Sequence, residues 1–295
     1  MNARAKAVDR AAILIIRMLA ALMGALLVWI FIFLIIKGAG QLTTLSFYRD
    51  APNLADVGGG IGPQLYNTFY ILILSMILTI PVGLAAGIYF AEYAGIGFVT
   101  NAVRRATETL ATLPSIIVGL FGFALFVQTM HISPSRLTSS MALLIINLPY
   151  AVRVTEDALR SLPGSMREGS LALGATRWQT ISRVLLPAAL PSLITGVVLT
   201  AGRVFGEAAA LLFAGAQGQI TQTGNYNLNP LAIGDTLAVN LYQFRIQAEP
   251  ASAAANARLG ELSYGMSALL VILVLLFNLG ARYLGRVAVR RLQGT

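Results

Sequence analysis

The sequence contains no cysteine, a single histidine (His131) and only two lysines, Lys6 and Lys37. The lack of cysteine excludes disulfides, thiol catalysis and cysteine-ligated metals. One histidine provides no cluster for a metal site. Neither lysine follows a glycine, so the Gly-Lys-Ser/Thr loop that binds nucleotide phosphates is absent. A Gly-x-Ser-x-Gly nucleophile motif is absent too. These absences argue against an enzyme, a metal site and a cofactor bound by this chain.

Charged residues are also scarce. They make up 11% of the 295 residues, and hydrophobic residues make up 57%, whereas soluble domains carry roughly 25% charged residues. The mean hydropathy is +0.74. Apolar runs near the length of a membrane helix recur along the chain, so the sequence predicts an all-α integral membrane protein. The six predicted spans are 12–36, 67–90, 111–130, 138–158, 188–213 and 265–284.

The net charge of +9 could suggest a nucleic-acid partner. The distribution of the basic residues favours membrane topology instead, because it follows the positive-inside rule. With the N-terminus inside, the inner segments hold Arg4, Lys6, Arg10, Arg17, Arg104, Arg105, Arg160, Arg167, Arg177, Arg183, Arg282, Arg286, Arg290 and Arg291. The outer segments hold only Lys37, Arg49, Arg136, Arg245 and Arg258. The bias predicts an inner-membrane protein with both termini in the cytoplasm and residues 214–264 outside.

A polar, basic segment, residues 168–187, lies between the fourth and fifth predicted spans. An acidic residue in it is followed at fixed spacings by a glycine, an aliphatic residue and a Leu-Pro pair. These positions are Glu168, Gly174, Val184, Leu186 and Pro187. The acid can favour a helix N-terminus, the glycine permits a turn or a close approach, and the proline suits the first turn of the next helix.

This spacing resembles the EAA loop of ABC-importer permeases. In that family the loop is a short cytoplasmic helix that docks into a cleft of the ATPase subunit. The resemblance implies ATPase-coupling roles for Glu168, Gly169, Ser170, Gly174, Ala175, Thr176 and Arg177. An ordinary basic cytoplasmic loop remains the alternative.

Two charges lie deep in the fifth predicted span. At 1.5 Å per residue, Arg203 is roughly 24 Å along a helix that starts at Pro187. A charge at this depth must face a bundle interior or a water-filled cavity. On a continuous helix Glu207 shares the face of Arg203, beside a seam made by Gly202 and Gly206. The pattern indicates either an oxyanion path, since arginine suits phosphate or sulfate, or a buried ion pair that only fixes packing.

A second arginine, Arg153, lies in the fourth predicted span after Asn147 and Pro149. It is a candidate for the same path. The alternative is an arginine that extends to the cytoplasmic interface. Glu92 and Glu108, in the second inner segment, are expected to be solvated charges.

Taken together, these motifs resemble the permease subunits of phosphate ABC importers, the PstA family. The resemblance covers most of residues 60–285. It rests on the Gly59–Pro63 run with Asn67 and Thr68, on Thr155–Leu159, and on Arg203–Leu212. It implies a MetI-like, type I importer fold with a cytoplasmic coupling helix. The implied organisation is a first transmembrane helix and outer loop at 1–66, a permease core at 67–285 and a cytoplasmic tail at 286–295.

The same resemblance implies a phosphate path through Arg203, Glu207 and Arg153. It also implies alternating access in a heterodimer with a second, PstC-like permease. The implied further partners are two PstB-like ATPase subunits, which would bind ATP and magnesium, and an extracytoplasmic PstS-like phosphate-binding protein. Two alternatives stay open: a permease for another oxyanion, such as sulfate, molybdate or phosphonate, and a membrane scaffold that does not transport.

Overall fold

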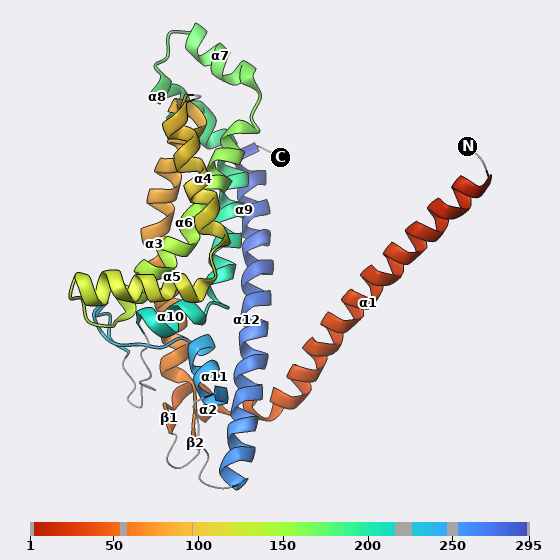
Figure 1. Cartoon of the computed structure of the whole chain (residues 1–295), viewed down its shortest axis with the longest axis vertical. Helices are drawn as coiled ribbons and strands as arrows, with labels where there is room; N and C mark the ends of the chain where they lie inside the picture. Colours follow the sequence, from red (N-terminus) through yellow and green to blue (C-terminus); the bar gives the residue numbers. More distant parts are fainter. Residues whose placement is uncertain (1–2, 54–57, 96, 216–225, 247–252, 294–295) are drawn as a thin grey trace.

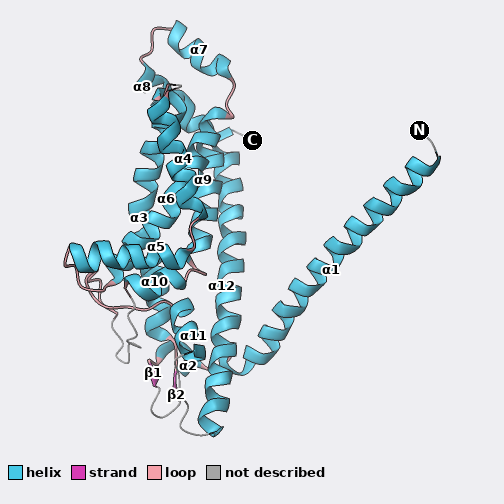
Figure 2. Cartoon of the chain, viewed as in Figure 1, coloured by secondary structure: helices cyan, strands magenta, loops and turns pink. Residues whose placement is uncertain are grey.

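The computed structural model describes residues 3–53, 58–95, 97–215, 226–246 and 253–293. Helices dominate this part of the chain (Figure 2). The described strands, β1 (Pro52–Asn53) and β2 (Gly58–Gly59), form one short antiparallel pair. The helices are α1 (Ala3–Leu42), α2 (Leu45–Arg49), α3 (Gly62–Ile88), α4 (Phe98–Thr112), α5 (Ser115–Gly122), α6 (Arg136–Arg160), α7 (Gly164–Ala172), α8 (Arg177–Thr180), α9 (Leu186–Val204), α10 (Ala209–Ala214), α11 (Leu237–Ile246) and α12 (Ala253–Gln293). Three π-helical turns, η1 (Tyr89–Tyr93), η2 (Phe123–Thr129) and η3 (Ile181–Leu185), extend α3, α5 and α8.

Five described helical runs are long and apolar enough to cross a membrane. They are Val8–Leu42, Gly62–Tyr93, Arg136–Arg160, Arg177–Val204 and Asn256–Gly280. A sixth crossing requires α4 and α5–η2 to act as one broken span, and these are bent by 106°. The all-α membrane fold is therefore confirmed, and the span predicted at 111–130 corresponds to the second arm of this bent pair, with a sharp break at its start. Pro114 is the cause, because a proline disfavours helical geometry in the residue before it.

The long helices α3, α6, α9 and α12 run side by side, and α4 lies along one end of this bundle (Figure 1). Helices α5 and α10 cross near its middle, α7 stands at the end that also holds the C-terminus, and α2, α11 and the β pair lie at the other end. Helix α1 diverges from the bundle. It approaches α12 near its own C-terminal end, where a Cβ at Gly38 would lie 2.8 Å from that of Ala268.

Helices α3 and α6 pack closely, and glycines make this contact possible. A Cβ at Gly83 would collide with Ala151, and one at Gly87 would collide with Thr155. Small residues at such an interface let two backbones approach closely, which is how helices associate in a membrane. The two glycines, four residues apart on α3, thus provide a close helix contact, and α6 is its partner.

Arg136, the first residue of α6, is fully buried, although the sequence placed it in an outer turn. Its guanidinium lies over the rings of Tyr66 and Tyr70, 5.4 and 5.0 Å from their centroids. It also donates to the carbonyl oxygen of Asn227 at 2.6 Å. Helices α3 and α6 thereby hold the segment that precedes α11.

Replacing Gly87 with alanine tests this packing. The new methyl group must displace Thr155, so we expect a loss of about 1–3 kcal/mol in the free energy of unfolding. The measurement is the unfolding midpoint of the purified protein in detergent. Gly24→Ala in α1 is the matched control, because nothing lies within 4 Å of a Cβ at that position. Equal midpoints for the two variants would contradict the packing.

Candidate functional site

The predicted coupling segment contains two short helices: α7, which stands apart at the end of the bundle, and α8, which begins the helical run that continues into α9 (Figure 1). The first, α7, begins at Gly164, after Pro163. Glu168 therefore lies in the middle of α7, and its predicted place at a helix N-terminus is wrong. Pro163 sets this start, because its fixed φ angle suits a position next to a helix N-terminus.

The turn between α7 and α8 is centred on Gly174, whose φ of 81° lies in the left-handed region. Glycine adopts this conformation without steric cost. Thr176 then starts α8 with a capping box: its hydroxyl accepts from the Gln179 amide, and the Gln179 side chain accepts from the Thr176 amide. The predicted turn at Gly174 is confirmed. A Cβ there would meet nothing within 4 Å, so no packing inside this chain requires the glycine.

The predicted coupling residues lie on or next to this pair of helices. Glu168, Gly169 and Ser170 are in α7, and Gly174 to Arg177 form the turn and the start of α8. Pro187 lies in the first turn of α9, but the helical run is continuous from Arg177 to Val204. The π turn η3 precedes Pro187, and a proline cannot donate the backbone hydrogen bond that a regular helix requires.

Glu92 is not the solvated charge expected from the sequence. Its carboxylate receives two hydrogen bonds from Arg167 of α7, with Nη2 at 2.7 Å and Nε at 3.0 Å from Oε1. Arg167 also donates to the carbonyl oxygen of Leu159 at 2.6 Å. The side chain of Glu92 is only 11% exposed. This pair ties α7 to the C-terminal ends of α3 and α6.

The fifth predicted span is broken at the charges that made it a candidate site. Helix α9 ends at Val204, and α10 begins at Ala209. Glu207 lies in the break, where it accepts a hydrogen bond from the Ala210 amide at 3.3 Å. Among the described residues, Arg203 and Glu207 form no ion pair with each other. The prediction that they share one helix face is therefore wrong. The predicted glycine seam fails at Gly206, which lies in the break, whereas Gly202 does approach another helix: a Cβ there would lie 2.9 Å from the side chain of Asn278 in α12.

Arg203 stacks on an aromatic ring of α6 instead. Its guanidinium carbon lies 4.3 Å from the centroid of Tyr150, in the range of a cation–π contact. Both side chains are exposed in the single chain. Four exposed side chains recur at helical spacing and form one polar face along the C-terminal half of α6. They are Tyr150, Arg153, Asp157 and Arg160. We call these four residues, with Arg203, the α6 polar face.

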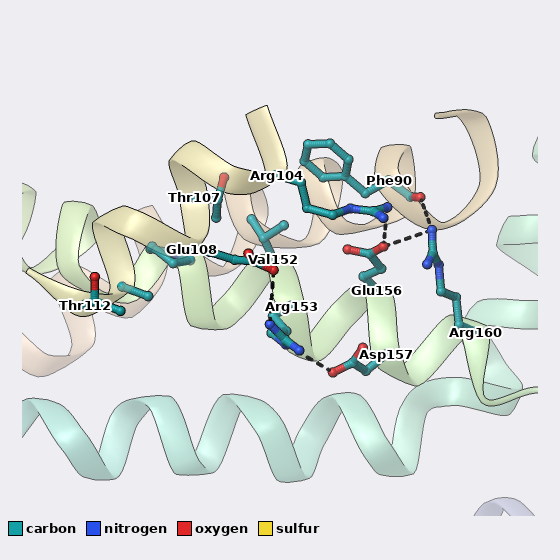
Figure 3. A pocket seen from close by; sticks show the side chains of 12 residues that line it. Phe90, Arg104, Thr107, Glu108, Thr112, Val152, Arg153, Glu156, Asp157 and Arg160 are labelled. Carbon is teal, nitrogen blue, oxygen red and sulfur yellow. Dashed lines mark hydrogen bonds and ion pairs between the residues drawn. The ribbon is translucent and has the colours of Figure 1, made fainter. Parts of the chain in front are cut away.

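A pocket of about 630 Å³ opens beside this face, between α4, η1 and α6. Figure 3 shows Arg153 turned toward Glu108 and Asp157. The nitrogen–oxygen distances of these two pairs are 3.6 and 3.8 Å, and the Arg153 side chain is 68% exposed. Exposed pairs with this geometry contribute little to stability. Arg153 is therefore held loosely at the mouth of the pocket.

Glu156, on the other side of the pocket, is held tightly. Its Oε1 lies 2.7 Å from Arg104 of α4 and 2.9 Å from Arg160, and its side chain is 12% exposed. These are the distances of charge-assisted hydrogen bonds. The arginines around the pocket thus fall into two classes: Arg104 and Arg160 share one mostly buried carboxylate, whereas Arg153 has only exposed carboxylates near it.

Sequence reasoning found Arg153 and Arg203 but missed Tyr150, on which Arg203 stacks. It also missed the Arg167–Glu92 and Arg104–Glu156 pairs, because pairs separated by tens of residues leave no local signal. The spacing of Tyr150, Arg153 and Asp157 on one helix face was the available clue. In the described part of the chain, no three His, Asp or Glu side chains converge as a metal site.

Comparison with known proteins places the chain among membrane transport components. It is 42% identical to the probable ABC transporter permease protein YqgI of Bacillus subtilis (strain 168), over 97% of this chain and 98% of that protein. It is 33% identical to the phosphate transport system permease protein PstA of Pasteurella multocida (strain Pm70), over 87% of this chain and 86% of the relative.

Solved structures share the fold at lower identity. A bacterial alginate ABC transporter, in complex with an alginate pentasaccharide-bound periplasmic protein, matches with a TM-score of 0.66 at 17% identity, over 95% of this chain and 96% of that one. The MetNI methionine ABC transporter in an inward-facing conformation matches with a TM-score of 0.58 at 22% identity, over 76% and 94%. Residues 80–294 match the family described as the binding-protein-dependent transport system inner membrane component. The chain belongs to this family, and it is a MetI-like permease subunit of an ABC importer.

Proposed function

We propose that this permease carries inorganic phosphate, and that the α6 polar face forms one wall of the path. The observation that carries the proposal is the state of Arg203 and Arg153. Both are exposed in the single chain. Arg203 has an aromatic ring and no described carboxylate as its partner, and Arg153 has only two distant carboxylates. Arginines in this state can offer their donors to a passing oxyanion.

The weak pairing matters because transport needs reversible binding. A site must attract the anion and then release it, so strong fixed neutralisation and strong binding are both unfavourable. Glu108 and Asp157, near Arg153, supply negative charge that competes with an anion for the same guanidinium. The relatives named phosphate permeases support phosphate among the oxyanions. Competition with sulfate, molybdate or phosphonate in uptake assays tests this choice.

The proposal includes partners. The open side of the α6 polar face would be covered by a second permease, and α7 with α8 would dock into an ATPase subunit on the cytoplasmic side, where both termini also lie. Two such ATPases would bind the ATP and magnesium, and an extracytoplasmic binding protein would deliver phosphate. A scaffold that does not transport is the second possibility. Phosphate-stimulated ATP hydrolysis by the assembled complex would exclude it.

Arg203→Gln tests the substrate path. Loss of a charge-assisted hydrogen bond costs about 1.5–3 kcal/mol, so we expect phosphate uptake to fall at least about tenfold. Stability should change little, because Arg203 leaves no described carboxylate unpaired. Uptake and the unfolding midpoint are measured on the same preparations. Arg105→Gln, at an exposed site on α4, is the control and should change neither quantity. Normal uptake by the Arg203 variant would contradict the assignment.

The turn at Gly174 generates a prediction for ATPase docking. Valine in the left-handed region costs roughly 1–2 kcal/mol, whereas asparagine tolerates that conformation. We therefore expect Gly174→Val to weaken binding of the purified ATPase by about 5- to 30-fold, and Gly174→Asn to retain most of the affinity. Equal affinities for the two variants would show that backbone conformation at this position is not required for docking.

Topology can be tested with single cysteines, since the natural chain has none. Leu173 and Leu228 are well matched, with 89% and 78% of their surface exposed. We expect Leu228→Cys to react with a membrane-impermeant maleimide in intact spheroplasts, and Leu173→Cys to react only after lysis. The reverse pattern would overturn the proposed orientation.

A further inference from the structure

Arginines from three helices converge on the π turn at the inner end of α3. Arg160 of α6 donates to the carbonyl oxygen of Phe90 at 3.1 Å. The guanidinium carbon of Arg104, from α4, lies 5.8 Å from the centroid of the Phe90 ring. Arg167 of α7 forms its two hydrogen bonds with Glu92 in the same turn. We call η1 with these three arginines the inner node.

Helix α7 has few other attachments to the bundle. None of its residues is buried, and Figure 1 shows it standing apart at the end of the molecule. Apart from the bonds of Arg167, its described links are the packing of Met166 against the inner hydrophobic cluster and a 2.9 Å hydrogen bond between the hydroxyls of Ser170 and Thr180. Arg167 is the only residue through which α7 forms a described ion pair, and its side chain is 25% exposed. Beyond its covalent connections to α6 and α8, α7 is therefore joined to η1 mainly through Arg167 and Glu92.

Helix α4 is attached to the node in a similar way. It buries no residue, and its described ion pairs with α6 are Arg104 to Glu156 and Glu108 to Arg153. Its C-terminal end meets a 106° bend at Leu113 and Pro114. A helix held by polar contacts and bounded by such a bend can move as a rigid unit. Its movement would change the distance between Glu108 and Arg153.

We propose that the inner node transmits movement of α7 to the substrate path, with Arg167 and Glu92 as positioning residues. Movement of α7 pulls η1 through the Arg167–Glu92 pair. Arg160, Arg104 and Glu156 pass this displacement to α4 and α6. Glu108 then moves relative to Arg153, which changes the competition for the guanidinium that the anion uses. The proposal rests on the proposed docking of an ATPase to α7 and α8.

The chain of contacts has the properties that transmission requires. The Arg167–Glu92 and Arg104–Glu156 pairs are short, partly buried, charge-assisted bonds between different elements, and Arg160 connects them by bonding both Glu156 and the carbonyl oxygen of Phe90. These elements cannot slide past one another without breaking a bond. Removing one member of such a pair leaves its partner uncompensated. The Glu108–Arg153 pair differs from these bonds, because it is longer and exposed. It lies beside the guanidinium that the anion would bind, where a change in distance would alter anion binding. A π turn in a helix is frequently a functional position, and here it is the point at which α4, α6 and α7 meet.

The test is the number of ATP molecules hydrolysed per phosphate taken up. The complete complex is reconstituted in proteoliposomes with its second permease, ATPases and binding protein. In Arg167→Gln and in Glu92→Gln we expect this ratio to rise by about tenfold, because the coupling is weakened while the ATPases still bind and hydrolyse ATP. Arg167→Lys keeps the positive charge but loses the bidentate hydrogen bonding of the guanidinium to Glu92, so it should give an intermediate ratio. Arg105→Gln is the control on α4 and should match the wild type.

A purely structural role for the pair would lower the amount of assembled complex without changing the ratio. An unchanged ratio in both glutamine variants therefore overturns the proposal, whatever the absolute rates. A second readout is the distance between spin labels at Arg105→Cys on α4 and Arg183→Cys in η3. We expect ATP to change this distance in the otherwise native complex but not when Arg167→Gln is added. An equal change in both would also overturn the proposal.

Failure of the proposed function gives a different result. If the wild-type complex takes up another oxyanion and not phosphate, the substrate assignment is wrong, and the same ratio is measured with that anion. If the wild-type complex moves no anion, the spin-label distance decides the inference by itself. If the ATPases do not bind at all, both the docking proposal and the inference fail.

Discussion

The structure depends on how a membrane protein neutralises its arginines. A guanidinium cannot lose its charge at accessible pH, so within the bundle it must find a carboxylate, an aromatic ring or water. Arg104 and Arg160 share Glu156, and Arg167 holds Glu92. These pairs fix the neighbouring ends of α3, α4, α6 and α7 relative to one another. Arg203 has only an aromatic ring as its described partner, and Arg153 has only exposed carboxylates at 3.6 and 3.8 Å. This contrast is the basis of the proposed anion path.

Helix α6 packs against α3 with one face and presents charged side chains on another. One face packs against the glycines of α3 so closely that no side chain fits between the backbones. Another bears Tyr150, Arg153 and Asp157 and is exposed in the single chain. The tight contact makes α6 a rigid support for the polar face, because closely packed helices shift as units and do not deform continuously. The position of Arg153 is therefore set by α3 and α4 as much as by α6 itself.

The extent of exposed apolar surface agrees with a subunit of a membrane complex. The most apolar window of α1 has none of its residues buried, and side chains such as Leu22 and Trp29 are exposed along it. Lipid tails satisfy such a surface as well as another helix does, so exposure alone does not identify a partner. The polar face of α6 is the more informative surface, since charged groups are costly against lipid and require water or a second subunit.

Composition and pattern by themselves determined the class of this protein. The scarcity of charge, the apolar runs and the bias of basic residues are local or summed properties, and the membrane fold followed from them. The permease family came from the resemblance of the spacing from Glu168 to Pro187 to a known loop. The glycine contact of α3 and the turn at Gly174 were also predictable, because glycine acts through its own backbone. Only the tertiary structure decided which charges pair. The break after Val204 separates Arg203 from Glu207, although their spacing suits one helix face. Glu92 and Glu156 find arginines 75 and 52 residues away, and a contact between distant segments depends on helix packing, which no local pattern records.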